Sequence, residues 1–357
     1  MHIVTTAVLD YRSNAIVELM RVAVADCDEQ WLKDALQRAI MLELATIPPY
    51  ASALWSIKDQ QSDVANAIRE IIFDEMSHFG LVCNMLTSIG GTPRLTGQST
   101  VPKYPGPLPG GVRPELEVYL SGLSKDSAYL FSEIEKPDNP IALAETYTSI
   151  GAFYSRIAEV FPNYAHLLTG RRQVDFPLSG QHGAGNDIVP MNTITDVLNA
   201  IEIIKAQGEG TDASPENPFP GKPGELAHYY RFREIYHGRK LIKISDSAHP
   251  KWDFQGDPIP MPDSHRAARV PDGGWANDPA NKPTPDTASK LQTFNGHYSS
   301  MLRALEQAWQ TDNPMPLVGQ AIGSMGSMRS SARDLVSIPL PDNSGKTYCP
   351  EYFYTAP

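Results

Sequence analysis

Apolar residues recur at helical spacing along most of the chain. Over residues 28–58 they fall at i, i+4 and i+7 on one face, and Asp28 stands at the position of an N-cap. Pro48 and Pro49 lie inside this segment and predict a kink or an interruption. A second helix is predicted over 63–89 and ends at a pair of glycines. A short polar turn joins the two helices, so we expect them to pack as an antiparallel hairpin.

Helical spacing returns after a segment rich in proline and glycine that follows the hairpin. The later predicted helices cover 141–168 with a break at Pro162, 194–209, a segment that begins at Glu225, and two segments near 288–310 and 316–337. Residues 246–289 hold many prolines and no sustained period. They predict an extended segment that wraps around the molecule or lacks fixed structure.

These elements divide the chain into three parts and predict an all-α fold. Residues 1–27 stay unassigned. Residues 28–245 are predicted to form a helical bundle with an insertion at 92–192. Residues 246–357 are predicted to form a Pro-rich wrapping segment plus two C-terminal helices packed on the bundle.

Composition and charge restrict the function. The chain has 357 residues, 41% of them hydrophobic, and a formal net charge of −11, so the basic surface needed to bind a nucleic acid is missing. No apolar run reaches the roughly 18 residues that cross a bilayer, and the first residues lack the pattern of a signal peptide. We therefore expect a cytoplasmic protein without a membrane partner. The three cysteines are far apart and predict neither a disulfide framework nor a thiolate metal site.

The second predicted helix carries a Glu-x-x-His pair, Glu75 and His78. At about 100° per residue, both share a face with apolar residues at 68, 71, 72, 79, 82 and 86. Glu70 and Asp74 lie roughly 140° and 100° from Glu75, so we expect them to face solvent. A buried carboxylate is costly unless it is paired or bound to metal. The Glu-x-x-His pair therefore predicts a polar site within the core.

Glu43 lies on the apolar stripe of the first helix and poses the same problem. The turn near residue 59 is about 16 residues from both Glu43 and Glu75. At 1.5 Å per residue, both carboxylates stand about 24 Å from the turn and meet at one level. Glu43, Glu75 and His78 then form half of a di-metal carboxylate site, which takes a Glu from one helix and a Glu-x-x-His from its partner.

The other half of such a site is predicted further along the chain. Glu209 ends one helix, and Glu225 and His228 begin the next, so the joining loop places them at the same height. A structural explanation also stays open, because Glu225 would favour the positive end of a helix and His228 would suit a core position. Three further candidates remain: Glu202, the Glu234-x-x-His237 pair, and Glu145 in the inserted helix.

Four segments resemble a known family. "LELATIPPYASALWSI", "IIFDEMSHFGLVCNMLTSIGGTP", "IEIIKAQGEG" and "AHYYRFREI", in this order, are similar to the ferritin-like domain shared with iminophenylpyruvate dimer synthases of bisindole pigment biosynthesis. The resemblance covers most of residues 28–357. It implies a ferritin-like four-helix bundle with long Pro/Gly-rich loops, an inserted helix and a C-terminal helical extension. It also implies metal ligands at Glu43, Glu75, His78, Glu209 and His228.

We therefore predict a metal-dependent enzyme of secondary metabolism that binds one or two iron ions, with manganese allowed by the same ligands. Glu43 and Glu209 would be terminal carboxylates, Glu75 a bridging carboxylate with Glu225 as a second candidate, and His78 and His228 imidazole ligands. The enzyme would be an oxidase or oxygenase, or would couple imines, and its substrate would be a small amino-acid-derived metabolite. The alternative is a non-catalytic metal-binding or structural protein. The sequence leaves homo-oligomerisation open.

Overall fold

Helices dominate the part of the chain that the structure describes. The computed structural model describes residues 10–137, 149–179, 186–209, 214–218, 224–245 and 251–356. In these ranges the regular strands form one two-stranded sheet, and no helix combines the length and the apolar character needed to cross a bilayer. The predicted helical fold class is confirmed.

Two long helices, α2 (Glu29–Ser56) and α3 (Asp63–Ser88), lie side by side. Each starts at a side-chain cap. The carboxylate of Asp28 accepts from the Trp31 N–H at 2.8 Å, and the hydroxyl of Ser62 accepts from the Ala65 N–H at 3.3 Å. Such caps satisfy N–H groups that have no partner inside the helix. The predicted hairpin and the predicted cap at Asp28 are confirmed.

No interruption occurs at Pro48 and Pro49, since α2 continues through both. Pro49 has no N–H to donate to the carbonyl of Ala45, one turn earlier. The hydroxyl of Tyr104 donates to that carbonyl instead, at 2.7 Å. A tyrosine from the loop after α3 therefore replaces the missing helical hydrogen bond, which sequence spacing alone does not reveal.

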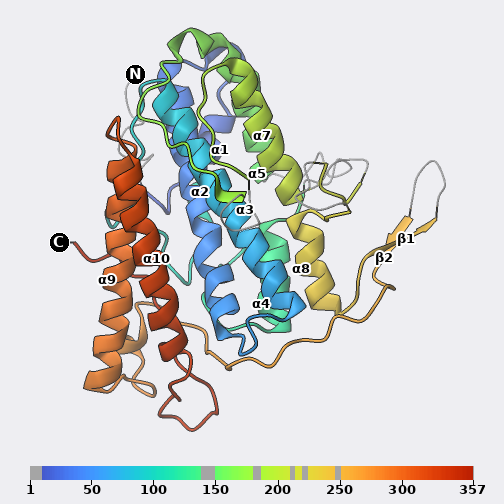
Figure 1. The fold of residues 1–357 in the computed structure, drawn as a ribbon, viewed down its shortest axis with the longest axis vertical. Helices are drawn as coiled ribbons and strands as arrows, with labels where there is room; N and C mark the ends of the chain where they lie inside the picture. The colour runs from blue at the N-terminus through green and yellow to red at the C-terminus, as the bar shows by residue number, and fades with distance from the viewer. Residues whose placement is uncertain are drawn as a thin grey trace.

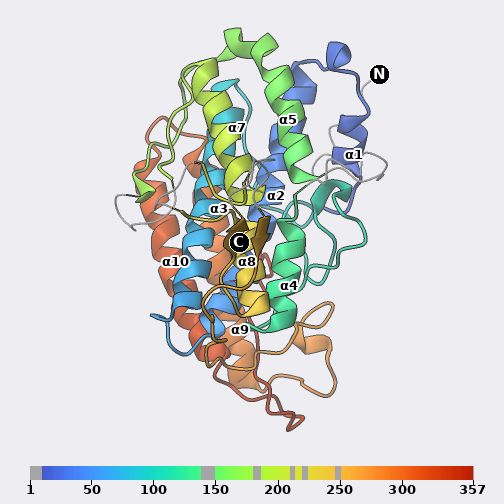
Figure 2. The ribbon, with the colours of Figure 1, turned by 90° about the vertical axis from the view of Figure 1, so that its right-hand side faces the viewer.

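The other side of the bundle consists of shorter helices stacked in two pairs. The four are α4 (Lys125–Ile134), α5 (Ile150–Val160), α7 (Ile194–Glu209) and α8 (His228–His237). Helices α4 and α5 contact α2, α7 and α8 contact α3, and α5 faces α7 as α4 faces α8. Figure 2 shows α5 above α4 and α7 above α8. Each pair takes the place of one long helix, so the bundle has two continuous and two broken members.

Several predicted boundaries change. Helix α8 begins at His228, not at Glu225, because residues 225–227 run beside 215–217 in an extended segment. Helix α4 was not predicted at all. Of the predicted helix over 141–168, residues 141–148 lie outside the described residues. The predicted break at Pro162 is confirmed, since α5 ends at Val160 and a 3-10 helix follows over Phe161–Leu167.

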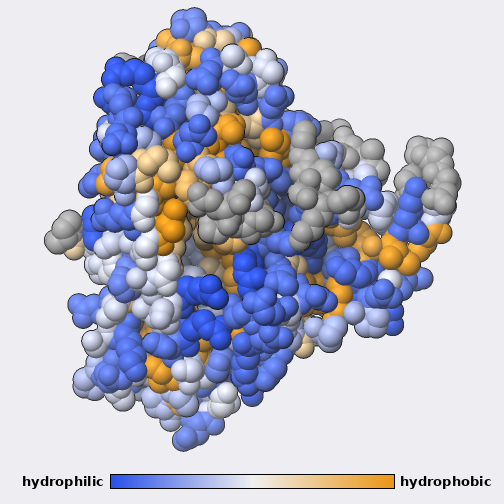
Figure 3. Space-filling model, in the orientation of Figure 1, coloured by the Kyte–Doolittle hydropathy of each residue, from blue (hydrophilic) through white to orange (hydrophobic). Residues whose placement is uncertain are grey.

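The remaining elements lie around the bundle. Helices α9 (Pro285–Ala308) and α10 (Met315–Leu335) pack on each other and α10 contacts α2, while α1 (Ala15–Met20) lies near the N-terminus (Figure 1). Strands β1 (Ile242–Ser245) and β2 (Lys251–Asp253) form an antiparallel hairpin that projects from the body. Short 3-10 helices occur at Val24–Asp26, Pro109–Gly111 and Trp275–Asn277. Figure 3 shows a mostly hydrophilic face with small apolar patches.

Candidate metal centre

Five carboxylate and imidazole side chains converge halfway along the bundle, where the short helices end and begin. Glu43 comes from α2, Glu75 and His78 from α3, Glu135 from the residue after α4, and His228 from the first position of α8. Each is between 1% and 7% exposed. This many ionisable groups are rarely buried together unless they bind one another or a cation.

The five side chains form two groups that share Glu75. We call Glu43, Glu75 and His78 the α2–α3 half, and Glu75, Glu135 and His228 the α4–α8 half. In each half, one ligand atom per residue lies within 4.8 Å of the others. His78 Nδ1 is 3.7 Å from one oxygen of Glu43 and 3.7 Å from Oε1 of Glu75. His228 Nδ1 is 2.9 Å from the same Glu75 oxygen and 3.9 Å from Glu135 Oε2.

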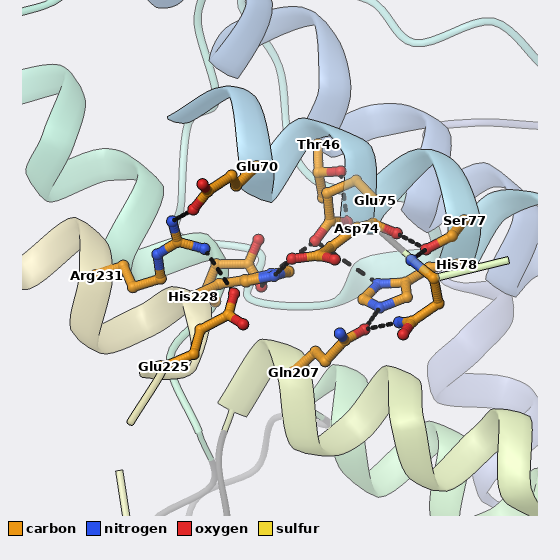
Figure 4. Close-up of polar contacts among 12 residues, drawn as sticks. Thr46, Glu70, Asp74, Glu75, Ser77, His78, Gln207, Glu225, His228 and Arg231 are labelled. Carbon is orange, nitrogen blue, oxygen red and sulfur yellow. Dashed lines mark hydrogen bonds and ion pairs between the residues drawn. The ribbon is translucent and has the colours of Figure 1, made fainter. Parts of the chain in front are cut away.

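Both imidazoles turn the same nitrogen toward the carboxylates. His78 donates from Nε2 to Gln207 Oε1 at 2.7 Å, and that oxygen also accepts from Asn186, which identifies it as the acceptor. His228 Nε2 faces Asp74 Oδ2 at 3.1 Å (Figure 4). With the proton on Nε2, Nδ1 carries a lone pair. His228 Nδ1 is buried and, within the described residues, has no hydrogen bond of acceptable angle despite its closeness to Glu75.

Each glutamate is held by one hydroxyl group and keeps its second oxygen for the centre. Thr46 donates to Glu75 Oε2 at 2.9 Å, Tyr50 donates to Glu135 Oε1 at 2.5 Å, and Tyr154 donates to Glu43 Oε1. The oxygens left over are those that face His78 and His228. Outer hydrogen bonds that orient carboxylates and imidazoles in this way are typical of metal sites.

Burial perturbs the titration of the cluster. Desolvation raises the pKa of Glu75 to about 8. Desolvation followed by the charge of Glu75 raises the pKa of both Glu43 and Glu135 well above the usual range of a carboxyl group. Desolvation and the neighbouring His228 lower the pKa of His78 to about 4. Without a cation the cluster therefore holds protons on its carboxylates and keeps His78 neutral, the state in which imidazole binds metal.

The charges of the cluster match two divalent cations. Glu43, Glu75, Glu135 and the adjacent Asp74 are four buried carboxylates. Among the described residues, no lysine or arginine forms an ion pair with any of them. Two divalent cations would neutralise four carboxylates. Oxygen and imidazole donors suit iron or manganese, and the free lone pair of His228 Nδ1 fits a metal ligand.

A small cavity reaches the cluster. Its volume is about 30 Å³, roughly twice what a single ordered water needs. The cavity is lined by Leu42, Glu43, Thr46, Glu75, His78, Ile134, Glu135, Ile150, Gly151, Tyr154, Ile204, Lys205 and Gly208. Apart from the cluster and two hydroxyl groups the walls are mainly aliphatic, and one lysine supplies a positive charge.

The structure brings together four of the six residues predicted as ligands: Glu43, Glu75, His78 and His228. It does not bring Glu225 to them, because Glu225 Oε1 accepts from Arg231 at 3.1 Å. Glu209 ends α7, but its side chain lies outside the described residues, as does all of Glu145. Of the other candidates, Glu202 is exposed and the buried Glu234 accepts from the Leu241 N–H.

Two residues of the centre were missed. Glu135 follows the unpredicted helix α4, whose signals were Ser124 as an N-cap and the apolar residues Leu130, Phe131 and Ile134. Asp74 was predicted to face solvent, and this is wrong, since it is only 4% exposed. Helix α8 packs on that side of α3 and its first residue, His228, bonds to Asp74. Angular position on one helix cannot reveal a neighbour that belongs to another.

Comparisons with known proteins agree with this architecture. A family model described as "Ferritin-like" matches residues 36–237. The crystal structure of a ferritin-like protein from Caulobacter vibrioides is similar, with a TM-score of 0.60 and 19% sequence identity, over 92% of this chain and 99% of that chain. At this identity the likeness concerns the fold alone. No curated protein matches the chain.

Proposed function

The chain belongs to the ferritin-like family, and we propose that it is a metal-dependent enzyme whose buried cluster binds two metal ions, iron in preference to manganese. The observation that carries the proposal is the position of Glu75, whose Oε1 faces an imidazole nitrogen in each half of the cluster. One carboxylate shared by two ligand groups suits a bridge between two ions.

Five residues would hold the ions: Glu43, Glu75, Glu135, His78 and His228. Bound iron would supply redox chemistry with oxygen or would act as a Lewis acid. The protein's own part is to orient the ligands through Thr46, Tyr50 and Tyr154 and to exclude bulk water with the aliphatic walls. The hydroxyl groups of Tyr154 and Tyr50 also place an O–H proton beside Glu43 and Glu135.

The lining of the cavity, and not its small volume, bears on the class of substrate. Ile134, Ile150 and Ile204 offer an apolar surface, and Lys205 offers one positive charge. A small metabolite derived from an amino acid, with an acidic group and an apolar part, would match this lining, and the cavity would have to widen to admit it. We propose an oxidase, an oxygenase or an imine-coupling reaction of the kind carried out by iminophenylpyruvate dimer synthases. The alternative is a metal-binding protein without catalytic activity.

Metal loading tests the proposal directly. Chelator-treated protein titrated anaerobically with Fe²⁺ is expected to bind two equivalents, and Glu75→Gln is expected to bind fewer than one, because a neutral amide replaces the anionic carboxylate that both halves share. Glu202→Gln is the matched control, since Glu202 is an exposed carboxylate of α7, and it should bind as the wild type does. Less than about 0.2 equivalent in the wild type, unchanged in Glu75→Gln, would overturn the metal site. Oxygen consumption with a panel of amino and imino acids then separates an enzyme from a non-catalytic protein.

A further inference from the structure

Helix α8 starts without the restraint that usually holds a helix terminus. Its N-cap residue, Ala227, has no side chain that accepts from the first N–H groups. The helix is only 10 residues long, and isolated helices shorter than about 12 residues are marginal in water. Yet its first residue, His228, must be held firmly if it is to face Glu75. Backbone pairing with 215–217 holds residues 225–227, which precede the helix, but a side-chain contact is needed to tie the first turn of α8 itself to α3.

Arg231 makes this contact. It lies one turn after His228, and its side chain is 10% exposed. Its guanidinium donates to Glu70 Oε2 at 2.6 Å and to Glu225 Oε1 at 3.1 Å. Glu70 belongs to α3 and Glu225 to the segment that leads into α8. Arg231 therefore joins the first turn of α8 both to α3 and to the chain before it (Figure 4).

The bond to Glu70 is in register with the bond that orients His228. On α8 the two residues are His228 and Arg231, three positions apart. On α3 their partners are Asp74 and Glu70, four positions apart in the opposite direction. Residues three and four apart lie on one face of a helix. Two cross-links on neighbouring turns fix both the height and the rotation of α8 against α3, which a single bond to Asp74 cannot do.

We propose that Arg231 is a positioning residue for the metal centre, and that it acts on the α4–α8 half alone. It sets the position of His228 by anchoring the first turn of α8, whereas Glu43 and His78 stand on α2 and α3 and do not depend on it. The fork of the guanidinium is essential, because lysine offers a point charge and cannot bond two carboxylates in this planar geometry. The proposal rests on the proposed function, since it concerns the same centre.

The first test measures the affinities of the first and the second metal ion separately. Wild type, Arg231→Met and Arg231→Lys are titrated with Fe²⁺ against a competing chelator, after their folding has been checked by circular dichroism and thermal unfolding. Arg231→Met should retain one equivalent at wild-type affinity and bind the second about 10- to 100-fold more weakly, the usual effect of removing an outer residue of a metal site. Arg231→Lys should recover only part of this loss.

Arg156→Met is the matched control. Arg156 is also a partly buried arginine, and it donates to the carbonyl of Val22 away from the cluster. The Arg156→Met variant should bind both Fe²⁺ equivalents with wild-type affinity. If Arg231→Met does not fold, Glu70→Gln weakens the same cross-link more gently and should lower the same second step. Normal binding of both equivalents by a folded Arg231→Met, or an equal loss of both, would overturn the proposal.

The second test needs no metal, so it stands even if the wild type binds none. Histidine-selective ¹⁵N labelling of the metal-free protein reports the tautomer of His228, identified by loss of its signals in His228→Asn. The wild type should show the Nε2–H form that the bond to Asp74 selects. Arg231→Met should show a mixture of tautomers for His228, while the signals of His78 stay unchanged. An unaltered His228 spectrum would contradict the positioning role whatever the metal content.

Discussion

The two halves of the centre are built in different ways. The α2–α3 half stands on continuous helices of 28 and 26 residues that pack along their length. The α4–α8 half stands on helix ends, since Glu135 follows the last residue of α4 and His228 is the first residue of α8. A ligand in the middle of a long helix is fixed by backbone hydrogen bonds on both sides. A ligand at a helix end depends on contacts made by other residues.

The helix ends also create an electrostatic difference. His228 lies at the positive end of the α8 dipole, which favours the negative charges of Glu75 and Glu135 nearby. Glu135 itself lies at the negative end of α4, which disfavours its ionised form. The two helix ends therefore act in opposite directions on the charge of the α4–α8 half, whereas the ligands of the α2–α3 half lie in mid-helix, away from either end. Because the ligands of the α4–α8 half stand on helix ends, we infer that cation binding completes this half and that the α2–α3 half is preformed.

The largest expected effect comes from removing one imidazole at a time. His78→Ala and His228→Ala should each lose one of two equivalents of Fe²⁺, a fall in affinity of more than about 100-fold at the altered half. The ion that remains in His228→Ala, held by the preformed half, should bind at least about tenfold more tightly than the one that remains in His78→Ala. Competition with a chelator measures both values. Equal affinities would show that the two halves do not differ in pre-organisation.

The same contrast explains what could be predicted from the sequence. The α2–α3 half follows from helical spacing, because Glu43 and Glu75 are equidistant from one short turn and spacing along two joined helices sets their relative height. Glu135 could not be found in this way. Its height depends on how α4, a separate short helix, packs against α2 and α8.

His228 was predicted as a metal ligand because it was expected to share a helical turn with Glu225, and the structure does not show this shared turn. The sequence places Glu225 and His228 on one helical turn, but α8 begins only at His228 and Glu225 bonds to Arg231. Loop residues 215–217, which pair with 225–227, decide where the helix starts. The position of Asp74 likewise depends on a neighbouring helix. Local periodicity therefore predicts the long helices and the ligands on them, and tertiary contacts determine the ligands at helix ends.

A smaller effect is expected from pH, through the residue that both halves share. In the metal-free protein the pKa of Glu75 is raised to about 8, so between pH 6.5 and 8 the folded state holds a proton that the unfolded state has lost. The free energy of unfolding should therefore fall as pH rises through this window, by up to about 1.4 kcal/mol per pH unit from Glu75 alone, and the raised pKa values of Glu43 and Glu135 act in the same direction. The lowered pKa of His78 acts in the opposite direction, but only below about pH 6.5.

Urea unfolding in the presence of a chelator at pH 6.5, 7.0, 7.5 and 8.0 measures this slope. Glu75→Gln should make it shallower, because the amide does not titrate, while Glu43 and Glu135 keep their contributions. Protein loaded with metal should not show the fall, since the cation displaces the proton and binds more tightly as pH rises. A metal-free wild type whose stability rises over this window would mean that Glu75 is ionised in the folded state, and the charge matching to two cations would lose its support.

The smallest expected effect compares Tyr154 and Tyr50, the two tyrosines that hold Glu43 and Glu135. Tyr154→Phe removes the donor to Glu43 in the α2–α3 half, and Tyr50→Phe removes the donor to Glu135 in the α4–α8 half. Glu43 is also fixed by the backbone of α2, whereas Glu135 follows the end of α4 and relies more on its hydroxyl partner. Tyr50→Phe should weaken one Fe²⁺ equivalent by about tenfold, and Tyr154→Phe should weaken the other by less, because outer hydrogen bonds matter most for poorly fixed ligands. Stepwise affinities measured against a chelator give the order, and a larger loss in Tyr154→Phe would reverse the assignment of which half is preformed.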